Sequence, residues 1–411
     1  MAHRRAIYNP INLHRVVRVL RPMALPLLTM LMAACGGGGI GSDRQDNADV
    51  SPAQPAPYVY SIPEQTDDGW ITGHFDDHGF DSEIIIELMS GISTGQFTGI
   101  DSITIVRNDT LILHSTFQRF LDEFDSWIGN TDPNLHILHS TSKSFTSALI
   151  GIAIDQGYIS SINTPFYELF SYADYLNPDP RKTALSLEDS LTMRLGFEWD
   201  EWSVPYTVPG NDLEDLMRNN SDYAKALLDL PMSSEPGTTF TYNTAATIAI
   251  GQALENAVGV PMDEYAELNL FQPLQIQSAI WGRTPTGLPN GGAGLFLEPR
   301  DMIKFGQLFL NRGRWKERQI LSGDWVTTSV TPHVTLDWPR SSGYGYQWWL
   351  GGLTYQDQAI ETWSTQGFGG QYIFCIPSLN LVVAFTAHNY DANEALPFTL
   401  MQDFVLKSLI N

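Results

Sequence analysis

Ser140 and Lys143 are the two residues whose types and spacing point most directly to chemistry. They lie in the run from Leu138 to Ser147, after which apolar residues recur at helical spacing through Ala153. Residues three apart share one face of a helix, so both side chains can point at one spot. A lysine buried there loses solvation of its charged form, so its pKa should fall and it could take a proton from the serine hydroxyl. The segment therefore predicts a nucleophile beside its base.

The start of this predicted helix adds an electrostatic contribution to the same spot. A helix N-terminus presents unpaired N–H groups and partial positive charge, which would stabilise an oxyanion formed on a substrate that Ser140 attacks. A plainer interpretation stays open at this point, because Ser140 could be a simple helix cap and Lys143 a solvated residue. Against that interpretation, the chain has only six lysines in 411 residues, and this one interrupts an apolar run.

Strand patterns lie at both ends of the body of the chain, on either side of a helical middle. Ile100 to Val106 and Thr110 to His114 predict a hairpin around a polar turn. Strand patterns return after Ser342, at 343–350, 371–376 and 381–387, and a helix-like run follows at 394–409. The sequence thus predicts an α+β fold, with an antiparallel sheet built from both ends and flanked by helices. A mainly helical subdomain is expected from about 160 to 330, with the site between the two parts.

The first 57 residues predict export and anchoring. An arginine-bearing segment and an apolar run from Met23 to Ala34 precede Cys35, and this run is long enough for a signal-peptide core but too short to span a membrane. Residues 36–57 have no apolar period and predict a tether, with the folded body at 58–411. Ala33-Ala34-Cys35 resembles the lipobox of bacterial lipoproteins. An ordinary signal peptide cleaved after Ala34 is the alternative.

The lipobox resemblance implies that residues 1–34 are removed and that Cys35 is lipidated. We therefore expect the protein in the bacterial cell envelope, touching a membrane only through its lipid anchor. Gly36 resembles the residue that follows the cysteine in outer-membrane lipoproteins. The oligomeric state stays open.

Net charge and cysteine content restrict the partners that the folded body at 58–411 can bind. The formal net charge of −23 makes nucleic acid and anionic membrane surfaces poor partners. The two cysteines, Cys35 and Cys375, are too few for a disulfide framework or a metal cluster. Acyl transfer to a serine nucleophile implies no metal and no cofactor, and the expected partner is a small-molecule substrate.

Several blocks in order resemble the serine β-lactamase and penicillin-binding-protein superfamily, most closely its branch of esterases and 6-aminohexanoate-dimer hydrolases. The resemblance begins at Ser140 and runs from about residue 58 to 409. The further matching blocks are Leu191 to Gly196, Pro236 to Thr244, Leu270 to Leu274, Arg300 to Leu308, Tyr344 to Trp349 and Gly367 to Tyr372. This family match implies a serine hydrolase that acts on an amide or ester through an acyl-enzyme on Ser140.

The resemblance also implies roles for residues outside the first block. Tyr242 would shuttle the proton between Ser140 and the leaving group with Lys143, and we expect a phenol near that cation to ionise more easily than in water. The oxyanion hole would combine the N–H of Ser140 with one from the strand carrying Gly367, Phe368 and Gly369. Substrate-binding residues predicted from the tyrosine block are Asn243 and Thr244.

Two departures from the superfamily pattern restrict the activity. Asn243 follows Tyr242 directly, and Thr244 stands where many relatives carry an asparagine. Thr365-Gln366-Gly367 replaces the usual K-T-G, so the lysine that commonly holds a β-lactam or a peptide carboxylate is missing. The absence of that lysine argues against β-lactamase or D,D-peptidase activity as the main task. The alternatives are a catalytically silent ligand-binding or sensor protein, and a β-lactamase or D,D-peptidase.

Three further patterns were weighed as rival sites. Gly91 to Gly95 matches G-x-S-x-G, but it follows a predicted helix rather than a strand, which favours a helix-ending turn. His139 is adjacent to Ser140, and sequence neighbours seldom achieve the geometry of a Ser–His pair, so a wall of the cleft or an entry to the helix is favoured. His74 and His78 lie in a polar turn that favours a surface loop over a metal site.

Overall fold

The computed structural model describes residues 58–390 and 394–410. The predicted signal peptide, the tether and Cys35 lie outside the described residues. Within them, nine strands form one sheet in the order β1-β3-β2-β16-β15-β14-β11-β10-β9. Their bounds are β1 Ile71–Thr72, β2 Ile100–Arg107, β3 Thr110–Thr116, β9 Val334–Trp338, β10 Ser341–Tyr344, β11 Trp349–Leu350, β14 Trp363–Gly367, β15 Gln371–Ile376 and β16 Leu381–Ala387.

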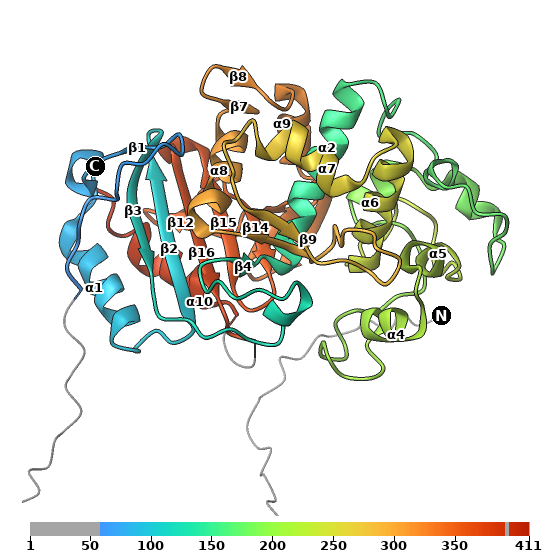
Figure 1. Ribbon diagram of the computed structural model, residues 1–411, viewed down its shortest axis with the longest axis horizontal. Helices are drawn as coiled ribbons and strands as arrows, with labels where there is room; N and C mark the ends of the chain where they lie inside the picture. Colours follow the sequence, from blue (N-terminus) through green and yellow to red (C-terminus); the bar gives the residue numbers. More distant parts are fainter. Residues whose placement is uncertain (1–57, 391–393, 411) are drawn as a thin grey trace, which may run out of the picture. The chain divides into compact units, whose positions relative to one another are not determined.

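Strands from the two ends of the chain lie side by side in the middle of this sheet. β2 pairs antiparallel with β16 from Arg107 opposite Leu381 onward, and the blue-green and red arrows are adjacent in Figure 1. Pairing through β16, β15 and β14 is antiparallel throughout. The prediction of a sheet assembled from both chain ends is confirmed.

Side chains alternate between the two faces of the sheet, and each face has its own core. On β15, Ile373 and Cys375 belong to one apolar cluster, while Tyr372, Phe374 and Ile376 belong to the other. This period of two is what an extended backbone imposes when both faces are buried. The sheet is therefore the middle layer between two sets of helices.

Helices from the chain ends and from the middle cover opposite faces. α1 (Ser82–Ser93) packs against the C-terminal turn η8 (Met401–Val405), which follows α10 (Leu396–Leu400). On the other face α8 (Pro299–Leu310) crosses β2, β16 and β15. Gly306 allows this approach, because a Cβ there would lie 2.6 Å from side-chain carbons of Ile373 and Val382.

The middle of the chain is mainly helical and carries the segments that flank the site. A 3₁₀ turn η3 (His139–Thr141) leads into α2 (Ser142–Asp155), which packs against α6 (Thr244–Val258). The remaining helices of this part are α3 Leu187–Leu191, α4 Asp212–Asn219, α5 Tyr223–Leu228, α7 Met262–Ala266 and α9 Gly323–Ser329. Short strands β4 (His136–Ile137), β6 (Leu295–Leu297) and β5 (Ala279–Trp281) form a small sheet beside η3.

The predicted α+β class is confirmed, with local differences. β1 pairs parallel with β3, so the sheet is mixed at one edge. The strand predicted over 343–350 is split into β10 and β11, because Gly345 N–H bonds to the Trp348 carbonyl at 2.9 Å and Gln347 adopts a φ of 65°. The helix predicted to run from 394 to 409 is shorter and widens into a π turn at η8. No helix among the described residues is long and apolar enough to cross a membrane.

Candidate active site

Ser140 and Lys143 meet at the start of α2. Ser140 sits in the η3 turn, and its Oγ lies 2.9 Å from the Nζ of Lys143, which donates a hydrogen bond to it. Lys143 is only 2% exposed, while Ser140 is half-buried and borders a pocket. The Ser140 hydroxyl therefore faces the cleft, and the Lys143 amine is buried behind it.

Lys143 has two further acceptors and, among the residues that the structure describes, no direct carboxylate partner. Its Nζ donates to Thr244 Oγ1 at 2.9 Å and to the Gly292 carbonyl at 2.8 Å. Burial lowers the pKa of Lys143 to about 7, and the charge of Glu201 opposes that shift. Near neutral pH a large fraction of this amine is therefore unprotonated, which is the form that can accept a proton.

Tyr242 reaches the same point from the segment before α6. The Nζ of Lys143 lies 4.9 Å from the centre of its ring, and a hydrogen bond to Ser140 joins its hydroxyl to the nucleophile. Burial, and after it the charge of Glu201, raises the pKa of Tyr242 above its ordinary value. The expectation of easier ionisation is wrong, since desolvation outweighs the nearby amine. Tyr242 is a neutral phenol that can pass a proton through its O–H group.

Glu201 is a buried acid that no sequence pattern singled out. It is 2% exposed and accepts four hydrogen bonds. The donors are Thr244 N–H at 2.6 Å, Thr244 Oγ1 at 2.5 Å, Tyr206 OH at 2.8 Å and Trp199 Nε1 at 3.3 Å. Glu201 is therefore separated from Lys143 by a single hydroxyl, that of Thr244.

Asn243 and Thr244, the two residues that follow Tyr242, both have hydrogen-bond partners within the protein. Asn243 is the N-cap of α6, with its side-chain oxygen accepting from Ala246 N–H at 2.8 Å, and it is 1% exposed. Its oxygen therefore serves as a helix cap, and the substrate-binding role of Asn243 stays a prediction. Thr244 does border the pocket at Ser140, but its hydroxyl is engaged with Lys143 and Glu201.

The glycine-rich end of β14 lies against the nucleophile turn. A Cβ on Gly367 would sit 2.3 Å from the Leu138 carbonyl, and one on Gly369 would sit 2.4 Å from the ring of Tyr390. The ring of Phe368 packs at 5.6 Å from that of His139, the residue before Ser140. These contacts bring the predicted oxyanion strand to the site, and the participation of its N–H groups stays a prediction.

The pockets at Ser140 are lined mainly by aromatic and aliphatic side chains. A small pocket of about 120 Å³ borders Ser140, and a neighbouring pocket of about 540 Å³ shares Phe124, Tyr206, Thr207 and Phe368 with it. Neither pocket has a lysine or arginine among its lining residues. The lining of the smaller pocket includes Trp127, His139, Leu213, Met217, Asn290 and Ala293, and that of the larger includes Glu123, Trp202, Asn389, Tyr390 and Glu394.

Two tryptophans, Trp202 and Trp348, differ in whether they line these pockets. Trp202 is 37% exposed and stacks on Tyr242 with ring centres 5.0 Å apart. Trp348 is fully buried against Phe305 and Phe309. Trp202 is therefore the tryptophan that presents a face to the larger pocket, whereas Trp348 belongs to the core.

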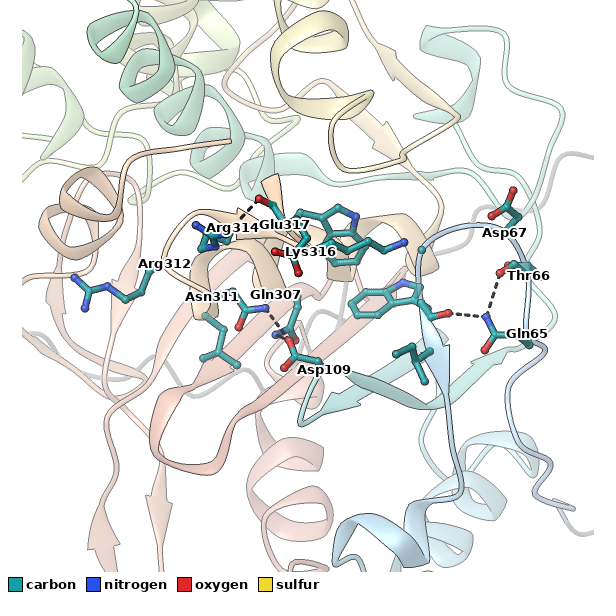
Figure 2. A pocket seen from close by; sticks show the side chains of 15 residues that line it. Gln65, Thr66, Asp67, Asp109, Gln307, Asn311, Arg312, Arg314, Lys316 and Glu317 are labelled. Atoms are coloured by element: carbon teal, nitrogen blue, oxygen red, sulfur yellow. Dashed lines mark hydrogen bonds between the residues drawn. The ribbon is translucent and has the colours of Figure 1, made fainter. Parts of the chain in front are cut away.

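A larger pocket of about 790 Å³ lies elsewhere, between the segment around Gln65 and the end of α8. Figure 2 shows hydrogen bonds among its lining residues: the side chains of Gln307 and Asn311 donate to the Asp109 carboxylate, and Arg314 donates to the backbone carbonyl of Glu317. It contains none of the residues that surround Ser140. Its size therefore does not make it the reaction site.

The rival sites considered from the sequence do not gain support. Ser93 lies at the end of α1, not between a strand and a helix. Burial lowers the pKa of His139 to about 3, and its Nε2 faces Tyr390 OH at 3.3 Å. Among residues 58–390 and 394–410, no group of three His, Cys, Asp or Glu side chains is placed to hold a metal ion.

The chain is similar to known proteins in sequence and in fold. Residues 101–403 match the Beta-lactamase family, and the chain belongs to that family. It is 22% identical to an N-acetylmuramyl-L-alanine amidase of Bacillus subtilis over 207 residues, which cover 38% of this chain and 46% of the amidase. The chain thus spans less than half the length of that curated relative.

Solved structures share the fold at low identity. A Bacillus anthracis protein provisionally named a 6-aminohexanoate-dimer hydrolase superposes with a TM-score of 0.59, at 19% identity, over 76% of this chain and 79% of that one. EstCE1, a hydrolase with promiscuous acyltransferase activity, gives 0.60 at 16% identity, over 79% and 98%. These likenesses show the fold, which agrees with the family match.

Proposed function

We propose that the protein is a serine hydrolase that cleaves a linear ester or amide through an acyl-enzyme on Ser140. The observation that carries the proposal is the 2.9 Å contact between Ser140 Oγ and a buried lysine amine whose pKa burial lowers to about 7. A nucleophile with an unprotonated base in contact is the minimum that acyl transfer requires. The amidase relative and the hydrolase EstCE1 are compatible with this chemistry.

The proposed reaction runs through two acyl transfers. Ser140 Oγ attacks the carbonyl carbon while its proton passes to Lys143 Nζ, and the resulting oxyanion is held by N–H groups of the Ser140 turn and the Phe368 strand. The intermediate collapses as the bond to the leaving group breaks. That group takes a proton from Tyr242 O–H, and the proton of Lys143 replaces it. Water then attacks the acyl-enzyme by the reverse path and releases Ser140.

The lining of the cleft favours an uncharged acyl group. The pocket of about 120 Å³ at Ser140 is lined largely by apolar side chains, and an apolar cavity of about 150 Å³ holds a benzene-sized ligand. Because neither pocket contributes a lysine or arginine, a substrate carboxylate has no cation to bind there. We therefore propose short, neutral acyl groups, and not β-lactams or peptide carboxylates, as the main substrates.

The test is hydrolysis of short p-nitrophenyl esters and anilides by residues 58–411. Ser140→Ala is compared with Ser233→Ala, a serine hydroxyl that bonds to the Phe197 carbonyl away from the site. We expect Ser140→Ala alone to abolish turnover and labelling by a fluorophosphonate, with nitrocefin barely hydrolysed. A folded wild type that is inert to ester, amide and fluorophosphonate would instead support the silent ligand-binding alternative.

We also propose that the protein is a lipoprotein of the bacterial envelope, attached through Cys35. The support is the sequence around that cysteine. Labelling of the full chain with radioactive palmitate in a bacterial host should depend on Cys35 and be lost in Cys35→Ser. Equal labelling of both chains, or of neither, contradicts the anchor.

A further inference from the structure

We propose that Glu201 is a positioning residue that, through the hydroxyl of Thr244, aims the lone pair of Lys143 at Ser140. This inference rests on the proposed function, because it concerns the base of that reaction. Glu201 does not touch Lys143 directly. The Thr244 hydroxyl lies between them, 2.9 Å from the amine and 2.5 Å from the carboxylate.

The argument is a count of donors and acceptors around the amine. A neutral lysine amine has two hydrogens and one lone pair, while three oxygens surround this one. The Gly292 carbonyl can only accept, so it takes one hydrogen. Thr244 gives its own hydrogen to a carboxylate that can only accept, so its oxygen is left to accept the second. The lone pair is then left for the remaining neighbour, Ser140, so the hydrogen bond that the charged amine donates to Ser140 Oγ is reversed in the neutral amine.

Both fixed acceptors are held in place by further hydrogen bonds. Asn290 Oδ1 accepts from the N–H groups of Gly292 and Ala293 at 3.0 Å each, which fixes the turn that presents the carbonyl. On the other side Asn211 Nδ2 donates to the backbone carbonyl of Glu201 at 2.9 Å. Since the surrounding groups are fixed before substrate binds, the direction of proton transfer is built into the resting protein.

The two oxygens of Glu201 differ in a way that makes a substitution informative. Oε2 faces the Trp199 indole and the Thr244 N–H, which can only donate. Oε1 faces two hydroxyls, of Thr244 and Tyr206, which can reverse. In Glu201→Gln the amide NH₂ must therefore lie on the Oε1 side and donate to Thr244. The threonine hydrogen then turns to the Lys143 lone pair and removes it from Ser140.

A pH profile separates this role from simple packing. The titratable groups that face Lys143 are Glu201, Tyr242 and His139, with Tyr206 behind Glu201. Because Glu201 raises the pKa of Lys143 against the effect of burial, its loss should move the acid limb of kcat/KM to lower pH. A merely structural change lowers the rate without moving that limb.

The experiment measures kcat, KM and the pH profile of ester hydrolysis for Glu201→Gln, Thr244→Val and Thr244→Ser. Glu255→Gln removes a carboxylate from the far end of α6 and is the matched control. We expect Glu201→Gln to lower kcat at least tenfold at the pH plateau, with KM within threefold and the acid limb shifted by half a pH unit or more. Thr244→Val should lose a similar factor, and Thr244→Ser should recover most of it.

The inference is overturned if Glu201→Gln keeps kcat within threefold and leaves the limb in place. Should that variant fail to fold, equal losses in Thr244→Val and Thr244→Ser overturn it instead. Titration of ¹³C-labelled lysines in wild type and Thr244→Val adds a readout that needs no turnover. A wild type inert to ester and fluorophosphonate defeats the proposed function. The coupling itself then stands or falls on whether the Lys143 signal titrates differently in Thr244→Val.

Discussion

The buried lysines Lys143 and Lys304 lie on helices α2 and α8, and they differ in what lies three residues before them. Lys304 on α8 is 0% exposed, and its Nζ lies 2.6 Å from the carboxylate of Asp301. Lys143 on α2 is 2% exposed, and the residue at the same spacing is Ser140. A carboxylate satisfies a buried ammonium, whereas a hydroxyl leaves the amine free to lose its proton. The same spacing thus builds an ion pair in one region and a base in the other.

The strongest test of the contrast between Lys143 and Lys304 is removal of Lys143, the amine without a carboxylate three residues before it. Lys143→Met should lower kcat/KM by about a thousandfold, because the general base is lost. The chain should still fold, which circular dichroism would check. Activity within tenfold of the wild type would mean that another group accepts the proton of Ser140.

The matching change at Lys304 should affect stability instead of activity. Lys304→Met leaves Asp301 buried without its partner, and we expect about 3 kcal/mol less stability from urea unfolding. Activity per folded molecule should be unchanged, because Lys304 bonds to Asp301 and the Gln275 carbonyl away from the cleft. If activity per folded molecule falls as far as in Lys143→Met, the two regions are not separate.

The wild-type pH profile measures the protonation of Lys143 directly. With the pKa of Lys143 lowered to about 7, the amine is protonated below that pH and cannot accept a proton. On the acid side kcat/KM should therefore fall about tenfold per pH unit, and it should level off above about pH 8. A profile that is flat from pH 5 to 8 would show that Lys143 is not the base.

A carboxylate placed at position 140 should make the surroundings of Lys143 resemble those of Lys304. Ser140→Asp gives Lys143 the same i,i+3 partner that Lys304 has, and we expect a gain of about 1 kcal/mol, since the position is half-buried. Ser140→Asn is the uncharged control. Thermal unfolding of the two inactive variants makes the comparison, and equal stability would show that Lys143 gains nothing from a carboxylate.

Much of the fold could be read from local patterns, because strands buried on both faces stand out in sequence. The runs predicted at 371–376 and 381–387 coincide with β15 and β16. The helix pattern after Ser140 likewise matches α2. The break between β10 and β11 was missed, since it depends on the left-handed backbone of Gln347, for which glutamine gives no signal.

From residue spacing alone, the site was predictable only where its chemistry lies within one segment. Ser140 and Lys143 are three residues apart, so helix geometry alone relates them. Glu201 lies in a loop between Trp199 and Trp202 and is linked to Lys143 through the Thr244 hydroxyl. Acids in loops are usually exposed to solvent, so residue type and position do not reveal this one. The Gly292 acceptor is a backbone carbonyl, which every residue has, so no residue type marks it. Such partners become visible only when the tertiary fold brings them together.

The pairing of β2 with β16 also determines when this chain can fold during its synthesis. Ser102 and Thr386 share a hydrogen bond of 2.7 Å across a separation of 284 residues in the chain. Strand β2 leaves the ribosome long before its neighbour in the sheet, β16, has been made. Contacts of such long range slow folding and leave strand edges exposed in the meantime. The sheet behind Ser140 is therefore completed only after β16 has been synthesised, and a chain cut before residue 381 lacks an interior strand.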